Sequence, residues 1–206
     1  MKRFFAAFRS SAKELTDIRC ILVTGLLIAV SMVIESQTIN LGFAKINFAF
    51  LAIAAIGMLY GPVVGLAAGG LCDIIGFVAF PDGGFLPLYT LLGMAQGLLY
   101  GTVAYRKLQC GSRTITVKGK RFDLMQLGRL FLARILDVIF INLICNTAAN
   151  YHYGFLASES SLVLAIYGRI AKNLIELPVD LLLMALILPA ILKAYEIVFG
   201  KRRATV

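Results

Sequence analysis

The sequence predicts an all-α integral membrane protein, a bundle of six transmembrane helices, and three observations indicate it. The 206 residues are 60% hydrophobic and 15% charged, whereas soluble domains average about 45–50% apolar and about 25% charged residues. The mean hydropathy is +0.87. Long apolar segments recur along the chain, and basic residues gather between them. Together these observations exclude a disordered chain and an ordinary soluble domain.

Six apolar segments form a single membrane domain that covers residues 1–206. They are residues 20–36, 46–60, 62–80, 84–105, 130–151 and 162–192. Pro62 begins the third, because the first turn of a helix does not need the N–H that proline lacks. Six spans of about 20 residues take up on the order of 120 residues, so no separate nucleotide-binding or catalytic domain fits.

The basic residues predict the orientation of these spans. Sixteen of the 20 lie in the N-terminal segment, the loop 106–129 and the C-terminal segment, which six spans place on one side. They are Lys2, Arg3, Arg9, Lys13, Arg19, Arg106, Lys107, Arg113, Lys118, Lys120, Arg121, Arg129, Lys193, Lys201, Arg202 and Arg203. Only Lys45 lies on the opposite side. Both termini and the basic loop are therefore expected in the cytoplasm, and the net charge of +9 reflects topology rather than nucleic-acid binding.

The sequence indicates no metal site, no cofactor and no catalytic motif. Cys20, Cys72, Cys110 and Cys145 have no C-x-x-C spacing, and His152 is the only histidine. The phosphate-binding motif G-x-x-x-x-G-K-[ST] does not occur, so we expect that the chain does not hydrolyse ATP itself.

Three spans carry small residues four positions apart. The first has Gly25 and Ala29; the third has Gly61, Gly65 and Gly69; the fourth has Gly93, Gly97 and Gly101. In lipid, small residues allow helix backbones to approach closely. We expect packing within the bundle for the third and fourth spans. For Gly25 and Ala29, a surface that docks another membrane protein is the alternative to packing.

Charged residues inside the sixth span indicate a functional site, because a charge at the centre of a bilayer costs several kcal/mol. At 100° per residue, its polar residues occupy one arc of about 100°, which predicts a polar face toward the bundle interior. These residues are Arg169, Lys172, Asn173, Glu176 and Asp180. A self-neutralising ladder, with Glu176 paired to both Arg169 and Lys172, is the structural alternative.

The fifth span adds a polar stripe of Asn142, Asn146 and Asn150, followed by Tyr151. Since this span ends outside and the sixth begins there, we expect the two polar faces to meet in the outer half of the membrane. Asp73 and Gln96 are candidates to join them, and Phe85 belongs to a Gly- and Phe-containing loop expected above them. The sequence therefore predicts an outward-opening polar pocket with aromatic walls.

Several motifs, in order along the chain, resemble the substrate-binding S components of energy-coupling factor (ECF) vitamin transporters, and among these the folate family. They are Leu15-Thr16-x-x-Arg19, Gly25-x-x-x-Ala29, Tyr60-Gly61-Pro62-Val63-x-Gly65, Asp73-Ile74-x-Gly76-Phe77, Gly83-Gly84-Phe85, Asn146-Thr147 and Arg169-Ile170-x-Lys172-Asn173-Leu174-Ile175-x-Leu177-Pro178. One segment departs from the family pattern, because Asn146-Thr147 is followed by Ala148-Ala149 instead of an aromatic-rich stretch such as Trp-Leu.

The resemblance implies a small prokaryotic plasma-membrane protein that captures a vitamin, most simply folate, from outside. It implies docking, through Gly25 and Ala29, on a transmembrane T protein that carries two ATPase subunits, and reorientation in the membrane without covalent chemistry. The substrate-binding residues that we expect are Asp73, Phe85, Asn146, Asn150, Tyr151, Arg169, Lys172 and Asn173. An S component for another planar vitamin or purine-like compound is one alternative. A small membrane enzyme that uses Asp73, Glu176 and Asp180 is another.

Overall fold

The computed structural model describes residues 2–36, 39–40, 45–46, 48–80, 84–106, 114–117, 120–155 and 159–200. Its helices are α1 (Lys2–Glu14), α2 (Ile18–Ser36), α3 (Phe50–Tyr60), α4 (Pro62–Ala79), α5 (Pro87–Ala104), α6 (Leu124–Leu136), the π-helix η2 (Asp137–Cys145), α7 (Asn146–His152) and α8 (Glu159–Phe199). Two antiparallel strand pairs complete it, β1 (Ile39–Asn40) with β2 (Lys45–Ile46) and β3 (Thr114–Val117) with β4 (Lys120–Asp123). Outside the described residues lie Gly83, Cys110 and the cations Lys107, Arg113, Lys118, Lys201, Arg202 and Arg203.

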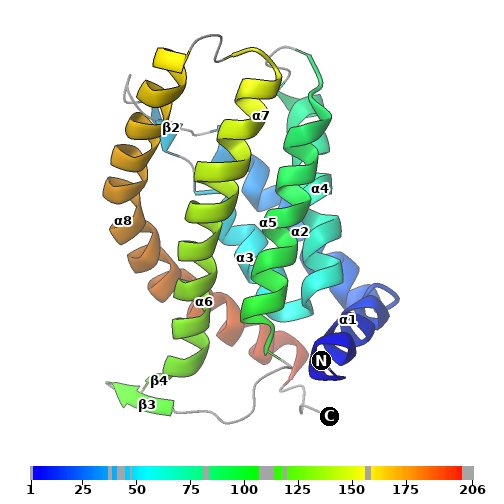
Figure 1. Ribbon diagram of the computed structural model, residues 1–206. Helices are drawn as coiled ribbons and strands as arrows, with labels where there is room; N and C mark the ends of the chain where they lie inside the picture. The colour runs from blue at the N-terminus through cyan, green and yellow to red at the C-terminus, as the bar shows by residue number, and fades with distance from the viewer. Residues whose placement is uncertain are drawn as a thin grey trace.

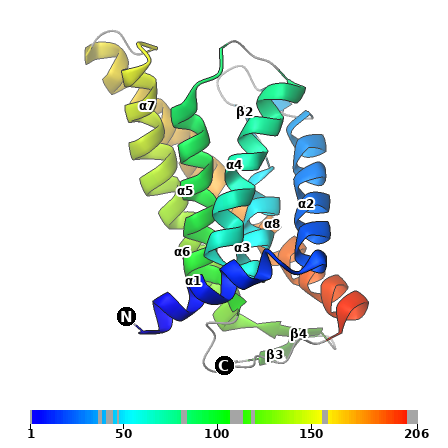
Figure 2. The same cartoon turned by 90° about the vertical axis from the view of Figure 1, so that its right-hand side faces the viewer.

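Side-by-side helices make up the body of the molecule (Figure 1). They are α2, α3, α4, α5, the continuous rod of α6, η2 and α7, and α8. Figure 2 shows α1 lying across one end of this bundle, at the same end as β3 and β4. α8 bends along its length and runs toward the same end (Figure 1). Pro178 and Pro189 lie inside α8, and proline inside a helix removes a backbone hydrogen bond and permits such a bend.

Some helix boundaries differ from the bounds of the apolar segments. The second apolar segment is helical only from Phe50, since Lys45 and Ile46 belong to β2. The loop 106–129 contains the β3–β4 hairpin and the first residues of α6, which begins at Leu124. The basic N-terminal segment forms α1, a helix that apolar-run counting does not detect because half of its surface is polar.

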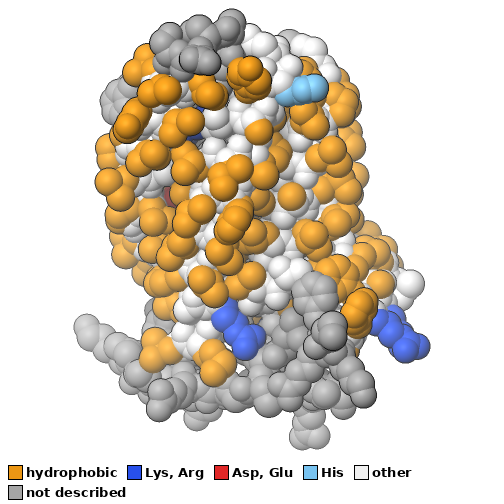
Figure 3. Space-filling view, viewed as in Figure 1, with side chains coloured by type: hydrophobic (Ala, Val, Ile, Leu, Met, Phe, Trp, Pro, Cys, Tyr) orange, Lys and Arg blue, Asp and Glu red, His pale blue; other side chains and the backbone are white. Residues whose placement is uncertain are grey.

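Length and composition mark this as a membrane protein. α2, α4 and residues Leu162–Phe199 of α8 are long and apolar enough to cross a bilayer. Large apolar side chains on them point outward, for example Leu26, Val78 and Leu182. In Figure 3, hydrophobic side chains cover the visible flank, and the Lys and Arg side chains stand out at the α1 end.

The core centres on α3 and on the contact between α4 and α5. Every residue of α3 is buried, as expected for a short helix that is apolar on all sides. A Cβ on Gly65 would overlap the carbonyl oxygen of Gly97, and one on Gly69 would overlap that of Gly93. The expected packing of the third and fourth spans through small residues is therefore confirmed. It fixes α4 and α5 as one unit at the side of the site described next.

Candidate ligand-binding site

A cavity of about 840 Å³ lies between α2, α4, α5 and α8, with η2 and the start of α3 completing its wall. Cavities that hold small organic molecules in proteins are typically about 300–1,000 Å³. Its lining combines carboxylates, amides and cations with phenylalanine and tyrosine rings. The cavity is thus large enough for a planar ligand of drug-like size, and its lining offers charged, amide and aromatic contacts.

The α2–α4 wall carries two carboxylates, Glu35 and Asp73. The hydroxyl of Thr90 on α5 donates a 2.5 Å hydrogen bond to Asp73 Oδ2. Glu35 lies at the end of α2 and borders Gly76 of α4, where an added Cβ would lie 3.5 Å from Glu35 Oε2. Carboxylates accept hydrogen bonds and donate none when ionised, so this wall suits a ligand edge that carries N–H groups.

Aromatic side chains form the part of the cavity next to the start of α5. Phe77 and Phe85 pack edge to face with ring centroids 5.3 Å apart, and Phe80 and Tyr89 also line the cavity. Phe85 is 46% exposed. Partly exposed rings at a cavity opening offer faces on which a planar ligand can stack.

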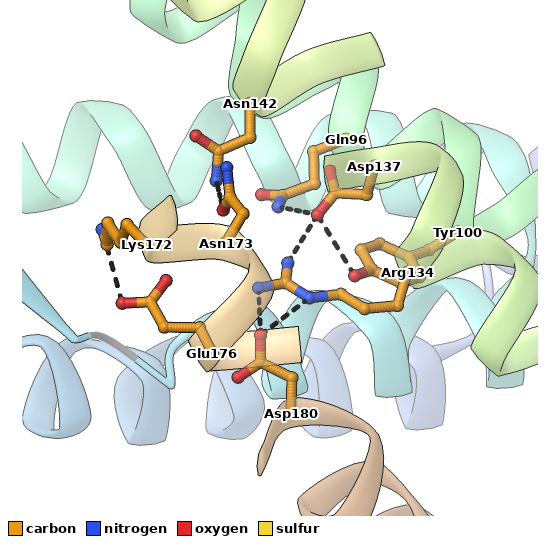
Figure 4. Close-up of polar contacts among 9 residues, drawn as sticks. All are labelled: Gln96, Tyr100, Arg134, Asp137, Asn142, Lys172, Asn173, Glu176 and Asp180. Carbon is orange, nitrogen blue, oxygen red and sulfur yellow. Dashed lines mark hydrogen bonds and ion pairs between the residues drawn. The ribbon is translucent and has the colours of Figure 1, made fainter. Parts of the chain in front are cut away.

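The opposite wall comes from α8 and η2 (Figure 4). Lys172 Nζ lies 3.5 Å from Glu176 Oε1, one helical turn further along. Asn142 of η2 donates a 3.2 Å hydrogen bond from Nδ2 to Asn173 Oδ1. Lys172, Glu176 and Asn142 line the cavity. The Lys172–Glu176 pair of the self-neutralising ladder is present, and the expected contact between the polar faces of the two spans is confirmed.

Arg134 of α6 also lines the cavity and belongs to a buried ionic cluster (Figure 4). Its Nη1 lies 2.6 Å from Asp137 Oδ2, and its Nη2 lies 2.7 Å from Asp180 Oδ2. Gln96 Nε2 and the Tyr100 hydroxyl donate to the same oxygen of Asp137, at 3.0 and 3.3 Å. Arg134, Asp137 and Asp180 are 6%, 1% and 3% exposed, so the cluster is removed from solvent.

The sequence-predicted binding residues fall into three groups. Asp73, Phe85 and Lys172 line the cavity. Asn173 and Arg169 both contact Asn142, Arg169 through a 3.2 Å hydrogen bond from Nη1 to its backbone carbonyl.

The third group lies along α7. The Tyr89 hydroxyl donates to Asn150 Oδ1, and Asn150 donates to Asn146 Oδ1 at 3.4 Å. Tyr151 is 62% exposed. Within the described residues, none of the α7 group lines the cavity, and the hydrogen bond from Tyr89 connects the group to it.

Sequence reasoning missed Glu35, Tyr89 and the role of Arg134. Glu35 was detectable as a carboxylate at the end of an apolar segment. Arg134 and Asp137 are three residues apart, a spacing that suggests an ion pair on a helix. Asp180 lies 46 residues beyond Arg134, and no local pattern joins the two. In the described part of the chain, no group of three or more His, Cys, Asp or Glu residues could hold a metal ion.

Gly25 and Ala29 lie on the outer face of α2. A Cβ on Gly25 would meet nothing within 4 Å, and both residues are exposed. In the described structure these two small residues therefore do not pack against another helix of the bundle.

A profile of the family described as "ECF transporter, substrate-specific component" matches residues 19–188. The chain belongs to this family. It is thus an S component, a member of a transporter family and not of an enzyme family.

Two curated relatives and one solved structure are similar to this S component. The folate transporter FolT of Clostridium novyi is 31% identical over 75 residues, which are 36% of this chain and 44% of that relative. FolT of Leuconostoc mesenteroides is 26% identical over 166 residues, which are 80% and 81% of the two chains. A crystal structure of FolT bound with folic acid matches with a TM-score of 0.62 and 24% identity, over 90% of this chain and 96% of that one. This likeness establishes the fold.

Proposed function

We propose that this S component binds folate from outside the cell and delivers it to an ECF module for import. The observation that carries the proposal is the cavity, in which the carboxylates Glu35 and Asp73, the rings of Phe77 and Phe85, and Lys172 line one space. Folate has a flat pterin with N–H donors, an aromatic ring and a carboxylate tail, and these parts match acceptors, rings and a cation respectively. The FolT relatives support the same substrate.

The binding residues that we propose comprise a contact set and a support set. Asp73, Phe85 and Lys172 form the contact set, since they line the cavity. Asn173 and Arg169 support it through Asn142. Asn146, Asn150 and Tyr151 belong to the segment that Tyr89 connects to the cavity, and we propose that they complete the site near its opening.

Titration of the purified, detergent-solubilised protein with folic acid tests the substrate. We expect saturable binding with one folic acid per chain, measured by isothermal titration calorimetry. Riboflavin and adenine, which are also planar and rich in nitrogen, serve as competing ligands and should not displace it. Tight binding of one of these in place of folic acid would contradict the folate assignment and identify another planar substrate.

We further propose six spans in the prokaryotic plasma membrane, within one domain of residues 1–206, with both termini in the cytoplasm. Support comes from the cations gathered before α2, after α5 and after α8, because cytoplasmic segments carry an excess of Lys and Arg. Reporter fusions that are active only in the cytoplasm, placed at each terminus and after Ala104, should all be active. A fusion within residues 153–158 should be inactive.

For delivery, we propose that a T protein docks on the exposed face of α2 around Gly25 and Ala29, and that two ATPase subunits supply the energy. The exposure of both residues supports this, since small residues permit the close helix contact that membrane partners use.

A further inference from the structure

The guanidinium of Arg134 is held on three sides. Nε and Nη2 donate to Asp180 Oδ2 at 3.2 and 2.7 Å, and Nη1 donates to Asp137 Oδ2 at 2.6 Å. Its flat face lies against the Phe50 ring, with Cζ 3.8 Å from the ring centroid. A planar fork that bonds two carboxylates while it stacks on a ring is within the reach of arginine but not of lysine. Arg134 is therefore fixed in a single arrangement.

Each partner of Arg134 either lines the cavity itself or is connected to a side chain that does. Phe50, the first residue of α3, lines the cavity itself. Asp137 holds Gln96, another lining residue, through the 3.0 Å hydrogen bond from Gln96 Nε2. The cluster thereby connects α6 and η2 with α3 and α5.

The third partner, Asp180, connects the cluster to α8. Glu176 and Lys172 lie four and eight residues before Asp180, and hence on the same face of the helix. Pro178 lies between Glu176 and Asp180 and has no N–H to complete the backbone hydrogen bonding there. The helix alone therefore holds this stretch less firmly, and the ion pair of Asp180 with Arg134 fixes it against α6.

We propose that Arg134 is a positioning residue for ligand binding, which holds Phe50, Gln96 and the Lys172–Glu176 pair in the arrangement that the ligand requires. This inference rests on the proposed function. Replacing a buried ion triad by well-packed apolar side chains of similar volume is often neutral or stabilising, whereas removing one partner is strongly destabilising because it leaves a buried charge unpaired. Stability alone thus gives little reason to keep three charges in an apolar interior. The position of Arg134 in the cavity wall, with Asp137 and Asp180 as its partners, gives one.

Two readouts test the proposal, one with ligand and one without. The first is the Kd for folic acid. The second is the rate at which a membrane-permeant maleimide labels Cys72, a cavity-lining thiol, in a background with Cys20, Cys110 and Cys145 replaced by serine. The variants are Arg134→Lys, Arg134→Met and the neutral triple Arg134→Met/Asp137→Asn/Asp180→Asn. Arg129→Met on the same helix is the matched control.

We expect all three variants to bind folic acid at least about tenfold more weakly and to label faster at Cys72, because the wall is no longer held. The neutral triple variant leaves no buried charge unpaired and should therefore retain the melting temperature of the unmodified protein, which separates positioning from loss of fold. Arg129→Met should match the unmodified protein in both readouts.

Normal affinity and normal labelling in the triple variant would overturn the proposal. Retained affinity in Arg134→Lys, together with loss in Arg134→Met, would also overturn it, because Arg134 would then act as a direct charge contact. If the unmodified protein fails to bind folic acid while the variants still label faster, the substrate is wrong and the positioning role stands.

Discussion

The hydroxyl oxygen of Ser11 accepts a 3.0 Å hydrogen bond from the backbone N–H of Val63, 52 residues later. The same oxygen accepts a 3.3 Å hydrogen bond from Val64 N–H. Both N–H groups belong to the first turn of α4, where a helix has no internal acceptors. Gly61, at the N-cap, has no side chain to supply one. Ser11 of α1 therefore caps α4 from a distance in the sequence.

Replacing Ser11 by alanine should lower the free energy of unfolding by about 1 kcal/mol, the usual loss for an N-cap. Denaturant unfolding in detergent micelles measures it. Ser10→Ala is the matched control, because Ser10 makes only a 3.3 Å contact with the Tyr105 hydroxyl. Equal losses in the two variants would contradict the capping role.

Asp73→Asn should weaken folic acid binding by about 10- to 100-fold, the range expected when a hydrogen bond to a charged group is lost. The substitution keeps the size of the side chain and removes the charge beside Thr90. Asp17→Asn is the same change between α1 and α2, where Asp17 accepts a hydrogen bond from Arg19 N–H. Calorimetric titration should find the affinity of that control unchanged, and a similar loss in both variants would argue against a specific role for Asp73.

Gly65→Ala should destabilise the protein by about 1–3 kcal/mol, since its Cβ would overlap the carbonyl of Gly97. Gly128→Ala on α6 should instead stabilise the protein. Nothing lies within 4 Å of its added Cβ, and alanine stabilises a helix interior relative to glycine by roughly 0.5–1 kcal/mol. Thermal unfolding in detergent should thus move in opposite directions for the two variants. A Gly65→Ala protein as stable as the unmodified one would contradict the close packing of α4 and α5.

Ala29→Trp should abolish uptake of radiolabelled folic acid in cells that contain an ECF module, yet leave binding by the purified protein unchanged. The large ring would prevent close approach of a partner to α2. Leu91→Trp, an exposed apolar position on α5, controls for the added bulk and should transport normally. Normal uptake by Ala29→Trp would place the docking surface elsewhere.

Hydropathy and helical periodicity were enough to predict the parts of the site that lie on one helix. The arc from Arg169 to Asp180 was predicted from 100° per residue, and in the structure Asn173 and Asp180 are buried and Lys172 lines the cavity. The glycine spacing in α4 and α5 likewise predicted their contact. Each of these patterns lies within a single helix, so the helical repeat of 3.6 residues is enough to predict it.

Features that depend on how helices sit beside one another were not predictable. Asn142, Asn146 and Asn150 form one stripe in an α-helix, but Asn142 lies in the π-helix η2. A π-helix bonds i to i+5 and so has more residues in each turn, which places Asn142 at a different angle from the other two. In the structure Asn142 lines the cavity, whereas Asn146 and Asn150 do not. No residue preference in the sequence marks η2 in advance.

The contact between α4 and α5 limits how the cavity can change. Where Gly65 faces Gly97 and Gly69 faces Gly93, backbone lies against backbone, so the two helices cannot move closer together, and moving apart would leave a gap that no side chain fills. Asp73 on one helix and Gln96 on the other therefore keep a constant separation. Since the Arg134–Asp180 ion pair holds the Lys172–Glu176 stretch of α8, any change in cavity volume falls to α2, which makes the wall that holds Glu35 the adjustable one.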